Sequence, residues 1–239
     1  MPIAYAEDYW RDGTFLKEGR PAVWDGYGLA DGVFETVAFR QNRLERWEAH
    51  LTRLREALAF YRLPIAYSDA ALGAYAETLL AGTDPGKDYR LRLTAARRGD
   101  GATVTMTYAE IGPPPPSVTL VPSDILRVAG NPSSRYKTLA YADHLVAQRD
   151  LRTTEMALLC NQWGRVACAT YANVFVRRGG AWVTPGVEEG ALPGVVRAEL
   201  LAAGAVEGRL EVAELAGADL LVTNSLLGEV PALLHPHHR

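Results

Sequence analysis

Four consecutive prolines, Pro113–Pro116, constrain the fold of this 239-residue chain more than any other stretch. Proline has no amide hydrogen for a helix or for the interior of a sheet, so the run predicts a stiff, extended spacer. A chain of this length can form two domains, each with its own core. We therefore predict an N-terminal domain over residues 1–112, a linker over 113–122 and a C-terminal domain over 123–239.

Before the prolines, apolar residues recur at two different periods. Alternation with a period of two, in stretches rich in β-branched and aromatic residues, indicates strands. Leu51, Leu54 and Leu58, at spacings of three and four, indicate a helix with one buried face. Asp100-Gly101 separates two alternating stretches and predicts a hairpin. Strands are expected over 32–40, 90–97 and 103–108, and helices over 46–61 and 68–81.

After the prolines, short apolar stretches are separated by glycine-containing turns such as Gly179-Gly180. Strands are expected over 117–122, 156–160, 165–176, 181–184 and 219–225, and helices over 138–151 and 194–203. Because strands and helices do not alternate regularly, we predict the α+β class. No Gly-x-Gly-x-x-Gly stretch follows a strand, which argues against a dinucleotide-binding fold.

Composition and charge exclude several classes of protein. The 25 basic and 28 acidic residues give a net charge of -3, which argues against a nucleic-acid binder. No apolar run reaches the roughly 18–20 residues of a membrane span, and no secretory signal pattern opens the chain. Cys160 and Cys168 are too few for a disulfide framework and are expected to be free thiols of a cytoplasmic protein. The histidines of the tail, His235, His237 and His238, suggest a frayed end, and no metal site is expected.

Three places suit an anion, and one lysine accompanies them. Arg53 can offer a planar fork of N–H groups to a phosphate, and the helix that Gly194 opens offers free backbone N–H groups. Thr223-Asn224-Ser225 offers hydroxyl and amide donors after a strand. Lys137 follows a proline-containing loop and precedes a predicted helix. Each feature alone is an ordinary cap, turn or surface residue, but together they predict pyridoxal phosphate bound by its aldehyde to the lysine.

Several stretches resemble a known family, in the family's order. They are Asp31-Gly32-Val33-Phe34-Glu35-Thr36, His50-Leu51-Thr52-Arg53-Leu54, Lys137-Thr138-Leu139, Gly164-x-Val166 with Ala172-Asn173-Val174-Phe175, and Leu192-Pro193-Gly194-Val195-Val196-Arg197. This set, within about residues 25–231, resembles the class IV (fold type IV) pyridoxal phosphate enzymes. They include branched-chain and D-amino acid aminotransferases and 4-amino-4-deoxychorismate lyases.

The resemblance implies both an architecture and a set of site residues. It implies a small α/β N-terminal lobe, a larger pseudo-barrel C-terminal lobe that carries the lysine, a cofactor between the lobes and a homodimer that acts on a small molecule. By this resemblance Lys137 is the Schiff-base lysine. The implied contacts to the phosphate come from Arg53, the backbone amides of Val195 and Val196, and Asn224 and Ser225. Tyr141 is a candidate contact to the cofactor's phenolic oxygen, or else a core aromatic residue.

Cys168 departs from the family's pattern. The family usually has a glutamate there, which pairs with the pyridine nitrogen of the cofactor and keeps it protonated. A thiol does this poorly, so the site at Cys168 implies a weaker electron sink. We expect this to harm a transaminase more than a lyase whose product gains an aromatic ring. Alternatively, Cys168 is only a small buried residue in a catalytically poor protein.

The last predicted strand favours one branch of the family. Thr223-Asn224-Ser225-Leu226, followed by Gly228 and Pro231, resembles the lyase form. Arg97 and Arg98 could meet the two carboxylates of 4-amino-4-deoxychorismate. The resemblance therefore predicts a lyase of folate biosynthesis that releases pyruvate and 4-aminobenzoate, with Lys137 as general base. A class IV aminotransferase or a degenerate cofactor-binding protein stays open.

Overall fold

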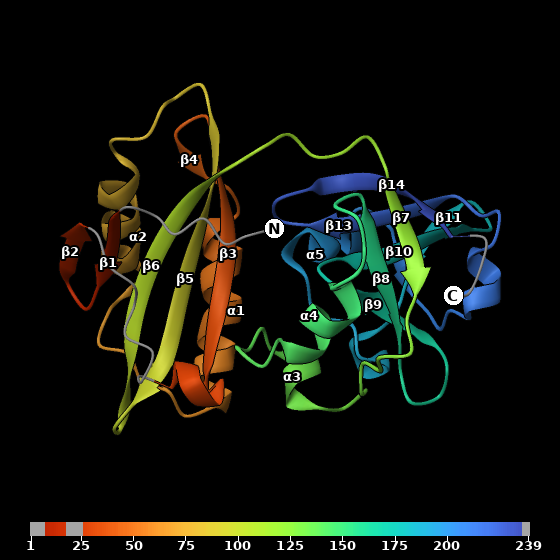
Figure 1. Ribbon diagram of the computed structural model, residues 1–239, viewed down its shortest axis with the longest axis horizontal. Coiled ribbons are helices and arrows are strands. Elements are labelled where there is room, and N and C mark those ends of the chain that lie inside the picture. The colour runs from red at the N-terminus through yellow and green to blue at the C-terminus, as the bar shows by residue number, and fades with distance from the viewer. Residues whose placement is uncertain (1–7, 18–25, 236–239) are drawn as a thin grey trace. The chain divides into compact units, whose positions relative to one another are not determined.

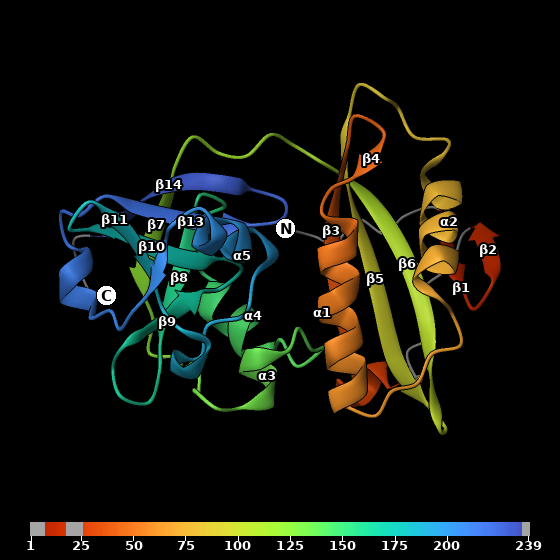
Figure 2. The same ribbon diagram turned by 180° about the vertical axis from the view of Figure 1, so that it is seen from behind.

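The computed structural model describes residues 8–17 and 26–235, which form two compact units (Figures 1 and 2). The first contains the described residues up to Pro113 together with Lys137–Ala140. The second contains Pro114–Tyr136 and the described residues from Tyr141 onward. The sequence predicts Lys137 in the C-terminal domain, whereas the structure places it in the first unit. His237 and His238 of the tail lie outside the described residues.

The first unit is built on a six-stranded antiparallel sheet in the order β2-β1-β6-β5-β3-β4. Its long central hairpin, β5 and β6, turns at Gly99 and Asp100, and Gly99 has a φ of 56° that favours glycine. The strands are β1 (Asp8–Arg11), β2 (Thr14–Lys17), β3 (Gly32–Arg40), β4 (Arg43–Leu44), β5 (Asp88–Arg98) and β6 (Gly101–Ile111), with a 3-10 turn at Tyr27–Leu29. The sequence does not predict β1 and β2.

Two helices, α1 (Trp47–Phe60) and α2 (Asp69–Leu80), lie on the same side of this sheet (Figure 2). The Ser68 side chain begins α2 by accepting a hydrogen bond from the Ala71 N–H at 3.2 Å. On α1 the buried face includes Leu51, Leu54 and Leu58, as the periodicity predicts. The same face also buries two polar residues, His50 and Arg53, against the sheet.

The second unit is built on a mixed eight-stranded sheet in the order β12-β11-β10-β13-β14-β7-β8-β9. The sheet curls so that β9, at one end of this order, contacts β10. Its core contains aliphatic residues such as Leu120, Leu158, Val174 and Val222. The strands are β7 (Val118–Pro122), β8 (Glu155–Cys160), β9 (Val166–Ala169), β10 (Asn173–Arg178), β11 (Ala181–Thr184), β12 (Val206–Glu207), β13 (Leu220–Asn224) and β14 (Gly228–Leu234). The helices are α3 (Pro132–Arg135), α4 (Ala142–Gln148) and α5 (Val195–Ala202), with 3-10 turns η2 (Val187–Glu189) and η3 (Val212–Leu215).

The α+β prediction is confirmed, and most predicted elements are found within a few residues of their expected bounds. Three expectations differ from the structure. The helix predicted over 138–151 is shorter, because Thr138 forms a bridge with Val33 and α4 begins only at Ala142. The strand region predicted over 165–176 is two strands, β9 and β10. Residues 118–122 form β7 within the second sheet, which confirms the strand predicted over 117–122, although the same residues also fall inside the predicted linker. None of the helices within residues 8–17 and 26–235 is long and apolar enough to cross a membrane.

Candidate functional site

Sheet pairing, not a helix, fixes the backbone of Lys137. The Phe34 N–H donates to the Lys137 carbonyl at 2.9 Å, and the Leu139 N–H donates to the Gly32 carbonyl at 3.0 Å. Thr138 lies opposite Val33 in this short antiparallel bridge. A Cβ on Gly32 would lie 2.7 Å from the Leu139 side chain and 2.6 Å from the Ala95 carbonyl oxygen. Glycine at position 32 therefore lets the lysine segment lie against β3.

The Lys137 side chain lies beside an aromatic ring. Its Nζ is 4.4 Å from the centroid of the Phe34 ring, and the Arg92 guanidinium carbon is 3.6 Å from the same centroid. Because Phe34 pairs with Thr94 and Thr36 pairs with Arg92, these four residues share one face of the sheet. The ring thus contacts two cations by cation–π attraction, on the face that Thr36 also occupies.

The opposite face of β3 holds a buried polar triad: Glu35, His50 and Arg53. Arg53 donates from Nε to one carboxylate oxygen of Glu35 at 2.8 Å and from Nη2 to the other at 2.6 Å. The His50 Nδ1 lies 2.7 Å from Glu35 Oε2. The planar fork that the sequence assigns to a phosphate therefore binds Glu35. A phosphate held by Arg53 would have to use other N–H groups of the guanidinium.

The triad is held in one charge state near neutral pH. Burial raises the pKa of the Glu35 carboxyl, but the charge and hydrogen bonds of Arg53 outweigh it and bring that pKa down to about 2. Burial lowers the pKa of His50 despite the nearby carboxylate. Glu35 is therefore ionised and paired with Arg53, and a neutral His50 donates its Nδ1–H to Glu35.

In the second unit, the N-terminus of α5 has the features of an anion site. Gly194 is its N-cap and no side chain caps it. A Cβ on Gly194 would collide with Asn173 Oδ1, and Asn173 Nδ2 donates to the Leu192 carbonyl at 2.9 Å. The backbone amides of Val195 and Val196 belong to the first turn, where N–H groups lack partners within the helix.

A buried hydroxyl lies beside this helix terminus. Thr223, 1% exposed, is opposite Asn173 in the pairing of β10 with β13, so the two side chains are neighbours. Thr223 Oγ1 has no hydrogen-bond partner among the described residues. A buried polar atom without a partner is costly, and a bound polar group removes that cost. The donors here fit a phosphate.

Asn224 and Ser225 follow Thr223, and the side chain of Asn224 holds the β13–β14 turn. Its Nδ2 donates to the Tyr171 carbonyl at 3.0 Å, and its Oδ1 accepts from the Leu226 and Leu227 N–H groups at 2.8 Å. The side chain of Asn224 is therefore engaged within its own unit. A phosphate contact in this turn would come from backbone N–H groups or from Ser225.

Cys168 lies on β9, 5% exposed, in an apolar cluster with Ala157, Leu159 and Ala167. Burial raises the pKa of its thiol more than the nearby Arg127 lowers it. Cys168 is therefore a neutral thiol and cannot replace the charge of a carboxylate.

The remaining predicted site residues have other contacts. Tyr141 is the N-cap of α4, and its ring stacks on His144 with centroids 4.6 Å apart. Arg97 is held within its own unit, by Asp31 at 2.6 Å and by the carbonyls of Tyr61 and Arg62 at 2.9 and 3.5 Å. The Arg98 side chain is 62% exposed and lies 4.0 Å from Asp12. These contacts give Arg97 a structural role.

The chain belongs to the class IV aminotransferases, because the model of that family matches residues 32–234. This family depends on pyridoxal phosphate, and the N-terminus of α5 offers donors that fit its phosphate. A curated relative, a probable branched-chain-amino-acid aminotransferase of Thermotoga maritima, is 25% identical over 176 residues, covering 72% of this chain and 63% of the relative. The chain thus spans less than two thirds of that relative's length.

Two solved structures share the fold. The branched-chain aminotransferase of Thermoproteus uzoniensis, solved with norvaline, has a TM-score of 0.84 at 21% identity, covering 96% of this chain and 87% of the other. The Escherichia coli branched-chain amino acid aminotransferase has a TM-score of 0.83 at 18% identity, covering 96% and 86%. At these identities the likeness establishes the fold alone.

Proposed function

We propose that the chain is a pyridoxal phosphate-dependent aminotransferase that moves the amino group of a small amino acid to a keto acid. The observation that carries this proposal is the fixed position of Lys137, paired to β3 with its Nζ beside the Phe34 ring. The names of the relatives support transamination over other reactions of the family.

In this proposal each residue has a definite task. The cofactor, when bound, supplies an electron-withdrawing ring that stabilises negative charge on the substrate carbon. Lys137 would hold the cofactor and would move the proton at the carbon that bears the substrate nitrogen. In the second unit, the Val195 and Val196 amides would bind the phosphate. In the first unit, Glu35 holds Arg53, the further phosphate contact that the family resemblance implies. Phe34 shapes the apolar surface next to the lysine.

A second candidate is the 4-amino-4-deoxychorismate lyase reaction, which a specific observation favours. The thiol of Cys168 is buried and neutral, so it supplies no negative charge where the family usually has a glutamate. Release of pyruvate from 4-amino-4-deoxychorismate creates an aromatic ring, which provides driving force that transamination lacks. The lyase therefore tolerates a weaker electron sink.

Covalent capture tests whether Lys137 carries the cofactor. The protein loaded with pyridoxal phosphate should be yellow, and borohydride should fix the cofactor on the peptide that contains Lys137. Lys137→Ala should abolish the fixed adduct, whereas Lys87→Ala, which removes an exposed lysine paired with Glu110, should leave it intact. A colourless protein, or an adduct on another lysine, would refute the proposed site.

Product analysis then separates the two reactions. Transamination requires a keto-acid acceptor and converts the amino donor into its keto acid. The lyase forms 4-aminobenzoate from 4-amino-4-deoxychorismate without any added keto acid. Formation of 4-aminobenzoate without transamination of any amino acid would replace the first proposal with the second.

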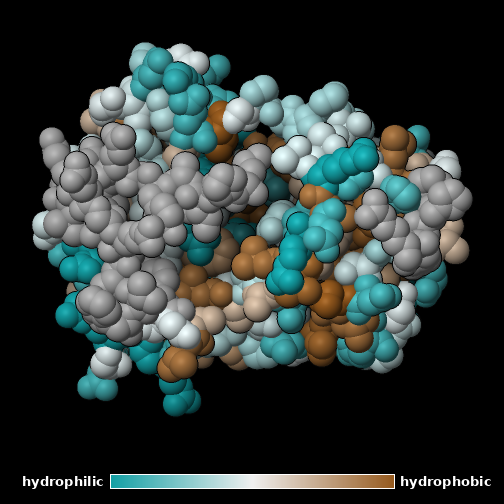
Figure 3. Space-filling model, in the orientation of Figure 1, coloured by the Kyte–Doolittle hydropathy of each residue, from teal (hydrophilic) through white to brown (hydrophobic). Residues whose placement is uncertain are grey.

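We also propose that the chain forms a homodimer. The second unit exposes large apolar side chains on α4 and before α3, namely Leu126, Val128, Leu145 and Val146, each 45–59% exposed. In Figure 3, hydrophobic residues are visible on the face of the second unit that is turned toward the viewer. Exposed apolar patches favour protein–protein contact. Light scattering should give twice the chain mass, and Leu145→Glu should weaken the dimer more than Leu233→Glu, a matched change of an exposed leucine on β14.

A further inference from the structure

Arg127 is a buried cation with an unused donor. Only 9% of the residue is exposed. Its Nη2 donates to the carbonyls of Ser133 and Ser134 at 2.7 and 3.1 Å, and its backbone N–H donates to the Cys160 carbonyl at 2.8 Å. Its Nε has no hydrogen-bond partner among the described residues. The carbonyls orient the guanidinium, but they do not neutralise its charge.

The arginine lies next to the strand that carries Cys168. A Cβ on Gly190, which has a φ of 98°, would be 3.4 Å from Arg127 Cγ and 3.5 Å from Ala167 Cβ, so the arginine stem and β9 meet at this glycine. The charge of Arg127 also acts on the Cys168 thiol, where it favours the ionised form but does not overcome burial. The other titratable group that acts on this thiol is Cys160, on the neighbouring strand.

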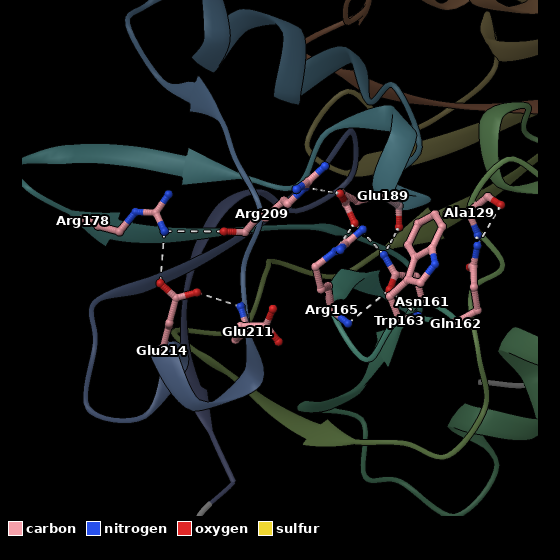
Figure 4. A network of polar contacts seen from close by, with 10 residues as sticks. All are labelled: Ala129, Asn161, Gln162, Trp163, Arg165, Arg178, Glu189, Arg209, Glu211 and Glu214. Carbon is pink, nitrogen blue, oxygen red and sulfur yellow. Dashed lines mark hydrogen bonds and ion pairs between the residues drawn. The ribbon is translucent and has the colours of Figure 1, made fainter.

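The carboxylate next to Gly190 has other partners. Glu189 accepts hydrogen bonds from Arg165 at 2.7 Å, from Asn161 at 2.7 Å and from Arg209 at 3.1 Å (Figure 4). Two arginines are thus paired with this carboxylate, whereas no ion pair joins it to Arg127 among the described residues. Within the part of the chain that the structure describes, the charged or titratable groups that act on Cys168 are Arg127 and Cys160, and neither is a carboxylate.

We propose that Arg127, with a thiol instead of a carboxylate at position 168, keeps the ring nitrogen of the bound cofactor unprotonated. The inference rests on the proposed cofactor site, in which Cys168 occupies the position nearest that nitrogen. A protonated ring would place a second positive charge near a buried arginine, and like charges disfavour the charged form. An unprotonated nitrogen can instead accept a hydrogen bond, which the unused Nε–H of Arg127 or the thiol can donate.

The consequence for the reaction is specific. An unprotonated ring withdraws electrons less strongly, so proton abstraction from an ordinary amino acid becomes slower than in relatives that have a glutamate. A reaction whose product becomes aromatic is slowed less. An unprotonated ring nitrogen would therefore favour the lyase reaction over transamination.

Nuclear magnetic resonance of the loaded protein tests the proposal directly. Pyridoxal phosphate labelled with 15N in the ring is bound to the full chain, and the 15N chemical shift reports protonation. The wild type should show an unprotonated nitrogen at neutral pH. Cys168→Glu should move the shift to the protonated range, whereas Cys168→Gln, of similar size without charge, should not. A protonated nitrogen in the wild type, or equal shifts in Glu and Gln variants, would overturn the proposal.

A second measurement does not require the cofactor. If Arg127 lacks a counter-charge, a carboxylate at position 168 pairs with its Nε. The cofactor-free Cys168→Glu variant should then melt at a higher temperature than Cys168→Gln, and Arg127→Gln should remove the difference. Equal melting temperatures would show that Arg127 does not act on position 168 and would overturn the inference. Failure of labelled cofactor to bind would instead refute the proposed function.

Discussion

The carboxylate of Glu35 holds Arg53, the residue that the sequence assigns to phosphate binding. It lies on β3 at 1% exposure, and both of its oxygens are occupied by Arg53 and His50. Two N–H groups of Arg53 donate to Glu35, so this carboxylate helps to fix the orientation of the buried guanidinium. The residue that the sequence assigns to phosphate binding therefore depends for its position on a residue with no assigned task.

Replacing Glu35 by Gln should test this dependence. The change leaves the Arg53 charge buried without its partner, which costs on the order of 3 kcal/mol of unfolding free energy. Cofactor affinity should fall as well, because the guanidinium is no longer held. Urea unfolding and absorbance titration with pyridoxal phosphate measure the two effects.

A matched control comes from an exposed ion pair. Glu110 accepts from Lys87 at 2.8 Å with both side chains about half exposed, and Glu110→Gln should change stability far less than Glu35→Gln. If Glu35→Gln proved as harmless as Glu110→Gln, the positioning role of Glu35 would be wrong.

At the scale of elements, the start of α5 depends on a close approach between a glycine and an asparagine. Gly194 has a φ of -69°, which any residue adopts, so its conformation does not require glycine. The close contact does, because a Cβ would collide with Asn173 Oδ1. Gly194→Ala should therefore either displace the Asn173 side chain from the Leu192 carbonyl or shift the first turn of α5, and weaken cofactor binding at least several-fold, as measured by absorbance titration.

Two further variants separate this effect from a general loss of stability. Gly82→Ala places a Cβ where no atom lies within 4 Å, so it should leave cofactor binding unchanged. Removing the obstacle with Asn173→Ala in the Gly194→Ala background should recover part of the affinity. Equal affinity of Gly194→Ala and wild type would mean that the first turn of α5 takes no part in binding.

The elements that the sequence predicts well are those with local causes. The periodicity of Leu51, Leu54 and Leu58 is a property of α1 alone, and the turn of the β5–β6 hairpin is encoded between its two strands. The non-helical backbone of residues 137–139 has a distant cause, because it follows from pairing with Gly32 and Phe34. Single-sequence patterns do not reveal such pairing, so the sequence predicts a helix there.

The candidate site likewise combines residues that the sequence identifies with contacts that only the fold reveals. Family motifs mark Lys137, Arg53 and Gly194, but the contacts of their side chains depend on which elements pack together. Glu35 alternates with Phe34 on β3, and only the position of α1 shows which of the two meets Arg53. The unpaired atoms of Thr223 and Arg127 have no signal in the sequence, because an unsatisfied donor is visible only after every neighbour is placed.

For the whole molecule, the triad predicts sensitivity to acid. The folded Glu35 has a pKa of about 2 against an ordinary 4.5, so its stabilisation is complete above pH 4.5 and is lost as the pH falls toward 2. The pKa of folded His50 is below its ordinary 6.5, so unfolding takes up a proton as the pH falls below 6.5. Both groups destabilise the folded state in acid, together by about 3 kcal/mol or more.

Urea unfolding at a series of pH values measures this dependence. Stability should be nearly constant just above pH 6.5 with respect to these two groups and should decline below it. Glu35→Gln should flatten the decline between pH 4.5 and 2, and Glu110→Gln should not. The same decline in wild type and Glu35→Gln would contradict the assignment of acid sensitivity to the triad.

The bridge between β3 and the lysine segment also sets an order of events during synthesis. Phe34 pairs with Lys137, so its partner leaves the ribosome only after roughly a hundred further residues have been added. Contacts between residues so far apart in sequence form late in folding. A nascent chain that ends in the proline run therefore holds Gly32 and Phe34 at a strand edge whose partner has not yet been made. Lys137 can take its place against β3 only after synthesis has passed into the second unit.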